Sequence, residues 1–132
     1  MIQFGVLDTS VFIASETGRP LEVALLPQEV ATTVITLAEL NAGVLAAGST
    51  EIRARRLATL DAVADMVALE VDEDAARVWA RLRVHLADTG RRMGINDLWI
   101  AAIAVSGGLT VITQDDDFAA LEGAPGFSAI RV

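Results

Sequence analysis

Short apolar runs alternate along this chain with longer segments whose apolar residues recur at helical spacing. A short run that is rich in β-branched residues and bounded by turn residues is typical of a buried strand. The runs predict strands at residues 4–8, 30–33, 66–71, 109–113 and 127–132. The intervening segments predict helices after residue 8, at 35–47, from 49 to about 65, from 72 to the loop at 90–94, at 98–105 and around 118.

Three polar residues mark where these helices are expected to begin. Ser49 and Asp72 precede helical segments as capping residues do, and we expect Asn96 to cap the helix at 98–105. That helix is almost entirely apolar, so it must be buried. Strands that alternate with helices predict a three-layer α/β/α sandwich around a parallel sheet of about five strands. At 132 residues, the chain is expected to form a single domain, residues 1–132.

Composition limits the chemistry that this domain can perform. Hydrophobic residues make up 53% of the chain, which supports a sizeable core. Cysteine is absent, so thiolate metal sites, disulfides and cysteine nucleophiles are excluded. All ten basic residues are arginine. Without lysine, P-loop nucleotide binding and Schiff-base chemistry are excluded as well.

The net charge of −8 argues against a protein that grips nucleic acid by electrostatics alone. Bound divalent cations reverse the local charge, so a metal-dependent nuclease is compatible with this composition. The first residues lack the pattern of a signal peptide, and the apolar run at 98–105 is too short to span a bilayer. We therefore expect a cytoplasmic protein with no membrane association.

Four acidic residues fall where the predicted fold would gather them. Asp8 ends the first strand, and Asp115 lies two residues after the fourth. Asp97 opens the buried helix, and Glu39 lies within an apolar helical stretch. Ligand sites in parallel sheets lie beyond the carboxyl ends of the strands. Clustered carboxylates without lysine partners favour a hard divalent ion such as magnesium or manganese.

Each acid also has a simpler interpretation, which for Glu39 is a solvated position on its helix. Asp8 is suited to cap a helix, Asp97 to complement a helix dipole, and residues 115–117 to form a solvated turn. A phosphatase that uses Asp8 as nucleophile is disfavoured because Ser10 stands where a second aspartate is expected. A metal-free ribonuclease commonly needs two histidines, and the chain has only His85. A catalytically silent module that binds RNA or protein stays open as an alternative.

Four segments carry a resemblance to a known family. They are Val-Leu-Asp-Thr-Ser at 6–10, Thr-Leu-Ala-Glu-Leu at 36–40, Asn-Asp-Leu-Trp-Ile-Ala-Ala at 96–102 and Val-Ile-Thr-Gln-Asp-Asp-Asp-Phe at 111–118. Together, in this order, they resemble the PIN-domain nucleases and, more narrowly, the VapC toxins of bacterial VapBC toxin–antitoxin pairs. The resemblance extends from the first strand to the last.

The resemblance implies endonucleolytic cleavage of RNA by magnesium or manganese. The site residues that it implies, both as catalytic residues and as metal ligands, are Asp8, Glu39, Asp97 and Asp115. Asp116 and Asp117 stand beside the last of these, so which acid completes the site is open at this stage. Thr9 and Thr113 are candidates to orient carboxylates or water.

The same resemblance implies partners. It implies a homodimer and a cognate antitoxin that lies across the site. Gln114 replaces an arginine that is frequent at this position in the family, which puts one phosphate contact in question. Among the arginines, we select Arg91 and Arg92 as candidates for binding RNA.

Overall fold

The computed structural model describes residues 3–132; Met1 and Ile2, which begin the N-terminal segment considered above, lie outside the described residues. One sheet contains five strands in the order β3-β2-β1-β4-β5, and every neighbouring pair is parallel. The strands are β1 (Phe4–Leu7), β2 (Glu29–Thr33), β3 (Ala68–Leu69), β4 (Thr110–Thr113) and β5 (Ala129–Arg131).

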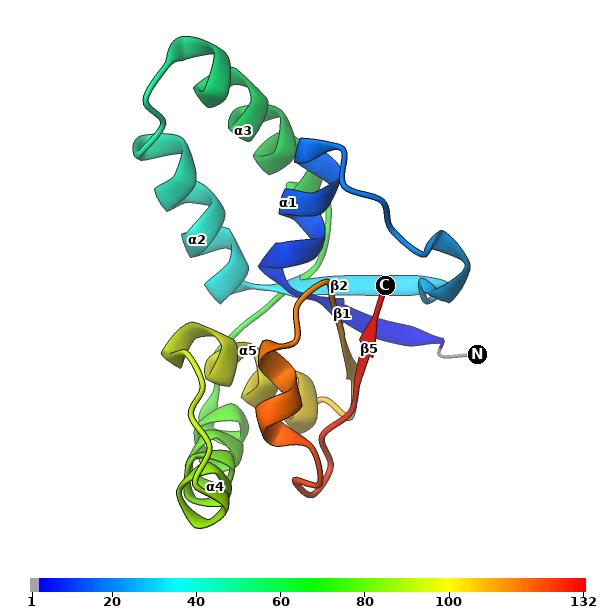
Figure 1. The fold of residues 1–132 in the computed structure, drawn as a ribbon, viewed down its shortest axis with the longest axis vertical. Coiled ribbons are helices and arrows are strands. Elements are labelled where there is room, and N and C mark those ends of the chain that lie inside the picture. The colour runs from blue at the N-terminus through cyan, green and yellow to red at the C-terminus, as the bar shows by residue number, and fades with distance from the viewer. Residues whose placement is uncertain (1–2) are drawn as a thin grey trace.

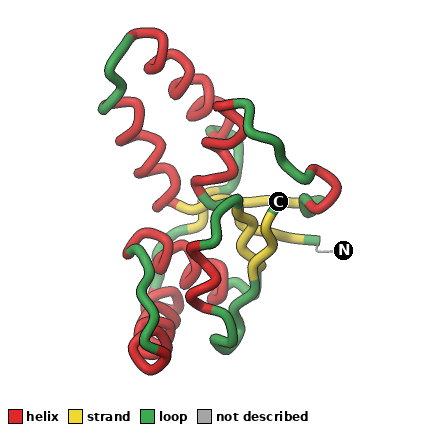
Figure 2. Tube along the Cα trace, in the orientation of Figure 1, coloured by secondary structure: helices red, strands yellow, loops and turns green. Residues whose placement is uncertain are grey.

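Helices cover both faces of this sheet (Figure 1). On one face lie α1 (Thr9–Thr17), α2 (Val34–Leu45) and α3 (Thr50–Val63), and on the other lie α4 (Glu73–Thr89) and α5 (Ile95–Ser106). Two 3-10 helices, η1 (Val23–Leu25) and η2 (Asp117–Leu121), lie in the connections (Figure 2). The predicted three-layer α/β/α sandwich with a parallel sheet of five strands is confirmed.

The central strands β1 and β4 are packed tightly on both faces. Val6 of β1 pairs in register with Val111 of β4, and neither side chain is exposed. Close packing also explains Gly5, since a Cβ there would lie 2.7 Å from Cγ1 of Ile112 and 2.8 Å from Cγ of Pro27. The two strands that end at the candidate acids are therefore held at the centre of the domain.

The apolar helix α5 is buried, as its sequence predicts. Ile100, Ala101, Ala102 and Ala104 of this helix are inaccessible to solvent and belong to the main core cluster. Its apolar character is therefore accounted for by its position between α4 and the sheet. Within residues 3–132, no helix combines the length and the apolar character needed to cross a bilayer.

Two of the three predicted helix caps are confirmed. Oγ of Ser49 accepts a hydrogen bond from the backbone N–H of Ile52, and Oδ1 of Asp72 accepts one from Ala75. The prediction for Asn96 is wrong, because α5 already begins at Ile95, so that Asn96 lies within the helix and the N-cap is Gly94. The backbone of Gly94 is extended, and its carbonyl accepts from the N–H of Leu98. Strands β3 and β5 are also shorter than predicted.

Candidate functional site

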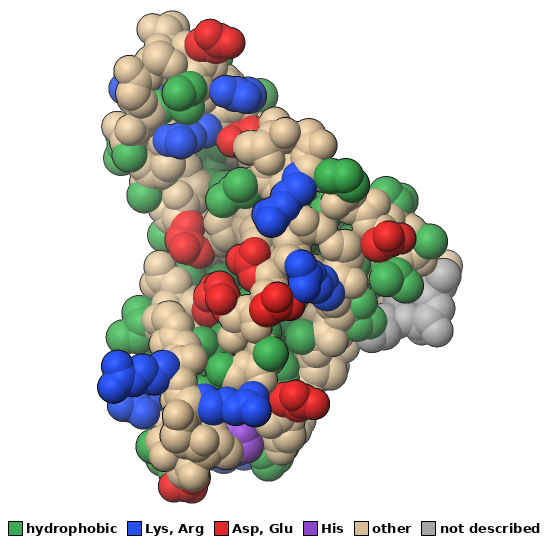
Figure 3. Space-filling view, viewed as in Figure 1, with side chains coloured by type: hydrophobic (Ala, Val, Ile, Leu, Met, Phe, Trp, Pro, Cys, Tyr) green, Lys and Arg blue, Asp and Glu red, His purple; other side chains and the backbone are tan. Residues whose placement is uncertain are grey.

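A pocket of about 310 Å³ opens at the carboxyl edge of the sheet, between the N-terminal ends of helices from both layers. Acidic side chains gather at the centre of this face of the molecule (Figure 3). The pocket is lined by Asp8, Thr9, Ser10, Ile13, Arg19, Glu39, Asp97, Asp115 and Asp117. All four acids selected from the sequence thus line one pocket.

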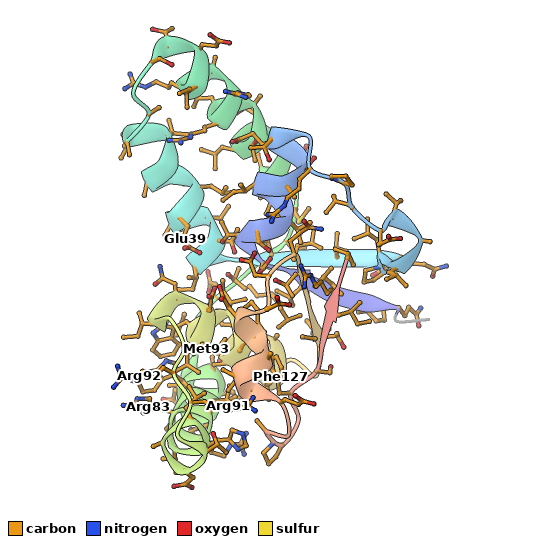
Figure 4. All side chains as sticks on the ribbon, in the orientation of Figure 1. Glu39, Arg83, Arg91, Arg92, Met93 and Phe127 are labelled. Atoms are coloured by element: carbon orange, nitrogen blue, oxygen red, sulfur yellow. The ribbon has the colours of Figure 1, made fainter. Side chains whose placement is uncertain are left out.

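The parallel sheet explains why these residues meet. Because every strand runs the same way, the residues that follow β1 and β4 lie at the same edge. Asp8 and Asp115 come from these two neighbouring strand ends. Glu39 reaches the pocket from α2, which follows β2 (Figure 4). Asp97 reaches it from the first turn of α5.

Asp8 is held from both sides by hydroxyl groups. Oγ of Ser10 donates to Oδ1 at 2.6 Å, and Oγ1 of Thr113 donates to Oδ2 at 2.7 Å. Burial raises the pKa of Asp8, the two hydroxyls lower it in part, and the charge of Asp115 raises it further. Asp8 also stands at the N-cap position of α1, where the backbone N–H of Val11 lowers its pKa although no capping hydrogen bond is formed.

The same two hydroxyls also fix the segment after β4. Oγ of Ser10 accepts from the backbone N–H of Gln114 at 2.9 Å, and Oγ1 of Thr113 accepts from that of Asp115 at 3.0 Å. Asp8 is therefore tied to the backbone that carries Asp115. The predicted orienting role of Thr113 agrees with this arrangement. Ser10 makes the same two kinds of contact, although the sequence did not single it out for this role.

Glu39 is half-buried and has its own hydroxyl partner. Oγ1 of Thr9 lies 2.7 Å from Oε1 of Glu39, to which it donates, and 3.1 Å from Oγ1 of Thr36. Thr36 is fully buried in the first turn of α2. Thr9 therefore connects α1 to the carboxylate on α2, in keeping with the orienting role expected of it.

Asp97 lacks such support. Within the described chain, residues 3–132, no hydrogen-bond donor contacts its half-buried carboxylate. Burial and the charges of Asp8, Asp117, Glu39 and Asp115 raise its pKa from 3.8 to about 6. Its place in the first turn of α5 suits the helix dipole, but the surrounding negative charges outweigh that benefit.

The acidic turn separates into two parts. Asp115 and Asp117 line the pocket, whereas Asp116 lines only the adjoining groove, which also contains Arg92. Oδ1 of Asp116 lies 2.5 Å from Nη1 of Arg131, with both side chains exposed. This ion pair leaves Asp115 and Asp117 as the two acids of the turn that face the other carboxylates.

The donor set of the pocket suits a hard cation, because every candidate ligand is a carboxylate or hydroxyl oxygen. The pKa of Asp97 is raised first by burial and then by the charges of the neighbouring carboxylates, and a bound cation would offset both effects. In the part of the chain described, no three acidic or histidine side chains are already drawn together as a metal-binding group.

Arginines lie on two sides of this pocket. Arg19, which the sequence did not single out, lines the pocket itself. Arg92 lines an adjoining groove together with Asp97 and Asp117, and Arg91 donates to the carbonyl oxygen of Ala119 at 2.7 Å. Figure 4 shows Arg91 and Arg92 on the loop between α4 and α5.

Comparisons with known proteins show which family the chain resembles. The PIN domain family model matches residues 5–124. Ribonuclease VapC5 of Mycobacterium tuberculosis is 70% identical over 128 residues, which cover 97% of this chain and 95% of that protein. Ribonuclease VapC4 of the same organism is 40% identical over 91% of this chain and 92% of its own length. The crystal structure of VapBC-5, from the VapBC family of toxin–antitoxin systems of M. tuberculosis, contains a chain with 67% identity and a TM-score of 0.93, covering 98% of both chains.

Proposed function

This chain belongs to the PIN-domain family as a VapC-type ribonuclease of a VapBC toxin–antitoxin system, and we propose that it cuts RNA endonucleolytically with a carboxylate-bound magnesium or manganese ion. The observation that supports this mechanism most strongly is the pocket that brings Asp8, Glu39 and Asp97 together with the turn after β4. Each of these residues comes from a different element of the fold.

The proposed ligands and catalytic residues are Asp8, Glu39, Asp97 and Asp115. When bound by carboxylates, a divalent ion would polarise the phosphate and lower the pKa of a water molecule, so that the water can be deprotonated at neutral pH. Asp117 also lines the pocket and remains the alternative fourth acid. Comparing Asp115→Asn with Asp117→Asn distinguishes them, since the residue that binds the ion loses more activity.

Hydroxyl side chains support the proposed ligands, and the ionisation of Asp97 limits metal binding. Ser10 and Thr113 hold both oxygens of Asp8 by hydrogen bonds, and Thr9 does the same for one oxygen of Glu39. Such supporting contacts keep ligand oxygens in one orientation. Asp97 must be ionised to bind a cation, so its raised pKa makes protons compete with metal below about pH 6.

The proposed partners follow from the same family. RNA is the substrate, and a cognate antitoxin protein is the proposed inhibitor, covering the pocket. We propose a homodimer, located in the cytoplasm. Arg91 and Arg92 are proposed RNA contacts, because Arg92 lines a groove that shares Asp97 and Asp117 with the carboxylate pocket.

The test is cleavage of end-labelled total RNA by the purified chain, freed of antitoxin. Magnesium and manganese are compared with EDTA, and wild type with Asp97→Asn, which keeps the shape of the side chain and removes its charge. We expect discrete fragments only with metal, and none from the variant. Equal cleavage by both proteins would place the activity elsewhere.

RNA binding without cleavage, unchanged by EDTA, would instead favour the catalytically silent module. Asp88→Asn is the matched control, since it removes the same charge from an exposed residue of α4 that lines neither the pocket nor the adjoining groove. Its cleavage pattern should equal that of the wild type.

A further inference from the structure

Arg19 is a cation in a pocket of carboxylates, yet it pairs with none of them. Among residues 3–132, it is the one basic side chain that lines this pocket. The ion pairs of the described chain involve Arg77 and Arg131, so no carboxylate oxygen lies within 4.0 Å of the Arg19 guanidinium. A guanidinium so close to five acids and still unpaired is available to another anion.

The backbone holds Arg19 at the rim of the pocket. Gly18, with φ of 74°, ends α1 in the left-handed conformation that favours glycine. The N–H of Arg19 then donates to the carbonyl oxygen of Ala14 at 2.8 Å. Pro20 follows and restricts the next φ angle. The direction in which the chain leaves α1 is thus fixed on both sides of Arg19.

Gln114 anchors the same turn from the other side. Its side chain is buried, and Nε2 donates to the carbonyl oxygen of Pro20 at 3.3 Å and to that of Val132. Its own backbone N–H is bound by Ser10. Gln114 therefore does not face the pocket; it connects the turn after β4 to the turn that carries Arg19.

We infer that Arg19 binds a phosphate of the RNA backbone at the carboxylate pocket, and that Gln114 positions it there. The inference rests on the proposed ribonuclease function. A planar guanidinium fork matches the oxygens of a phosphate, and the charge supplies the attraction that the surrounding acids lack. Because phosphates carry no sequence information, this contact supplies affinity and position rather than choice of sequence.

The experiment measures RNA binding as a function of salt in a background that does not cleave. End-labelled single-stranded RNA of mixed sequence is titrated with Asp97→Asn protein, with and without Arg19→Gln, from 0.1 to 1 M KCl. One lost phosphate contact on a single strand lowers the slope of log affinity against log salt by about 0.7, or about fivefold over this range. Equal slopes would overturn the inference.

Two further variants test separately the charge of residue 19 and its positioning by Gln114. Arg19→Lys keeps the charge and should retain the slope. Gln114→Ala should reproduce the reduced slope, and combining it with Arg19→Gln should add nothing further. Arg81→Gln is the matched control, an exposed arginine on α4 that lines a groove sharing no residue with the pocket. Its slope should equal that of the background.

In the cleaving wild-type background, Arg19→Gln should slow every cut alike and leave the positions of the cuts unchanged. A changed set of cut sites would show that Arg19 reads bases, which contradicts a phosphate contact. Failure of the proposed function is distinct from failure of this inference, because it appears as continued cleavage by Asp97→Asn itself.

Discussion

The two sides of the carboxylate pocket solve the problem of a buried negative charge in opposite ways. On the strand side, both oxygens of Asp8 accept hydrogen bonds from hydroxyls, which offset part of the cost of burial. On the helix side, Asp97 has no such donor in the described chain and faces four other carboxylates. The carboxylate of Asp8 is therefore held in place by protein hydrogen bonds. The carboxylate of Asp97 is repelled by its neighbours and has no such partner.

This difference indicates what each residue contributes. A carboxylate that already has protein donors keeps its orientation whether or not a cation is present. A carboxylate that is repelled by its neighbours gains most when a cation arrives. We therefore expect substitutions on the strand side to lower both the stability of the fold and the cleavage activity. Substitutions on the helix side should lower the cleavage activity without lowering the stability.

The largest effect is expected from the charge of Asp8. Asp8→Asn should lower single-turnover RNA cleavage about a thousandfold, because several kcal/mol of charge stabilisation depend on a correctly held metal ion. The amide keeps the volume of the side chain but replaces one acceptor oxygen by a donor, so the free energy of unfolding should fall while circular dichroism still shows a folded protein. Activity within tenfold of the wild type would show that Asp8 is not a ligand.

Next in size is the hydroxyl that supports Asp8. Thr113→Val should lower the free energy of unfolding by about 2 kcal/mol, because it leaves Oδ2 of Asp8 and the N–H of Asp115 without their buried partner. Cleavage should fall about tenfold or more as the ligand loses its orientation. Chemical denaturation and cleavage rates measure the two effects.

Thr113→Ser is the matched control for this change, since it keeps the hydroxyl and removes only the methyl group. It should retain most of the activity. If Thr113→Ser were as inactive as Thr113→Val, packing of the methyl group would matter more than the hydrogen bond to Asp8.

A smaller effect should appear in the pH dependence of metal-free protein. Because the pKa of Asp97 is raised from 3.8 to about 6, the folded state holds its proton more tightly than the unfolded state. The contribution of this group to stability is therefore greatest below pH 4 and is lost as the pH rises through 6. After allowance for solvent screening, we expect a loss of about 1 kcal/mol.

Denaturation in EDTA between pH 4 and 7 measures this dependence. Since other acids titrate over the same range, the informative quantity is the difference between wild type and Asp97→Asn. That difference should grow with pH in favour of the variant. A constant difference would mean that Asp97 titrates normally.

The smallest effect is expected from Asp116. Its ion pair with Arg131 is exposed on both sides, so Asp116→Ala should change the free energy of unfolding by about 0.5 kcal/mol or less. Cleavage should stay close to that of the wild type. A loss as large as that of Asp115→Asn would show that the turn rearranges to bring Asp116 to the metal.

Much of the fold and the acidic site could be predicted because both follow from local pattern. Strand ends in a parallel sheet share an edge, so acids that follow β1 and β4 were expected to meet. Asp116 could not be separated from its neighbours, because its partner Arg131 lies 15 residues away on β5. The start of α5 was misplaced since Asn96 is a common cap, whereas Gly94 caps with backbone alone.

Ser10 and Arg19 were missed for a related reason, and Gln114 was noted only because it replaces an arginine that is frequent in the family. The sequence does not indicate the contacts of Ser10 and Gln114, because they join segments that are far apart in the chain. Ser10 binds the backbone of Gln114, and Gln114 binds that of Pro20, across separations of 104 and 94 residues. Only the folded sheet places these groups side by side.

The most direct test of this account is the melting temperature of Asp97→Asn beside wild type, in EDTA and in manganese. In EDTA, the variant should melt about 4 °C higher, because a repelled charge has been removed. Manganese should then raise the melting temperature of the wild type, through binding to the folded state, and leave that of the variant unchanged. A variant that melts lower in EDTA, or that gains as much from manganese as the wild type, would contradict the assignment of Asp97 as the charge that the metal ion neutralises.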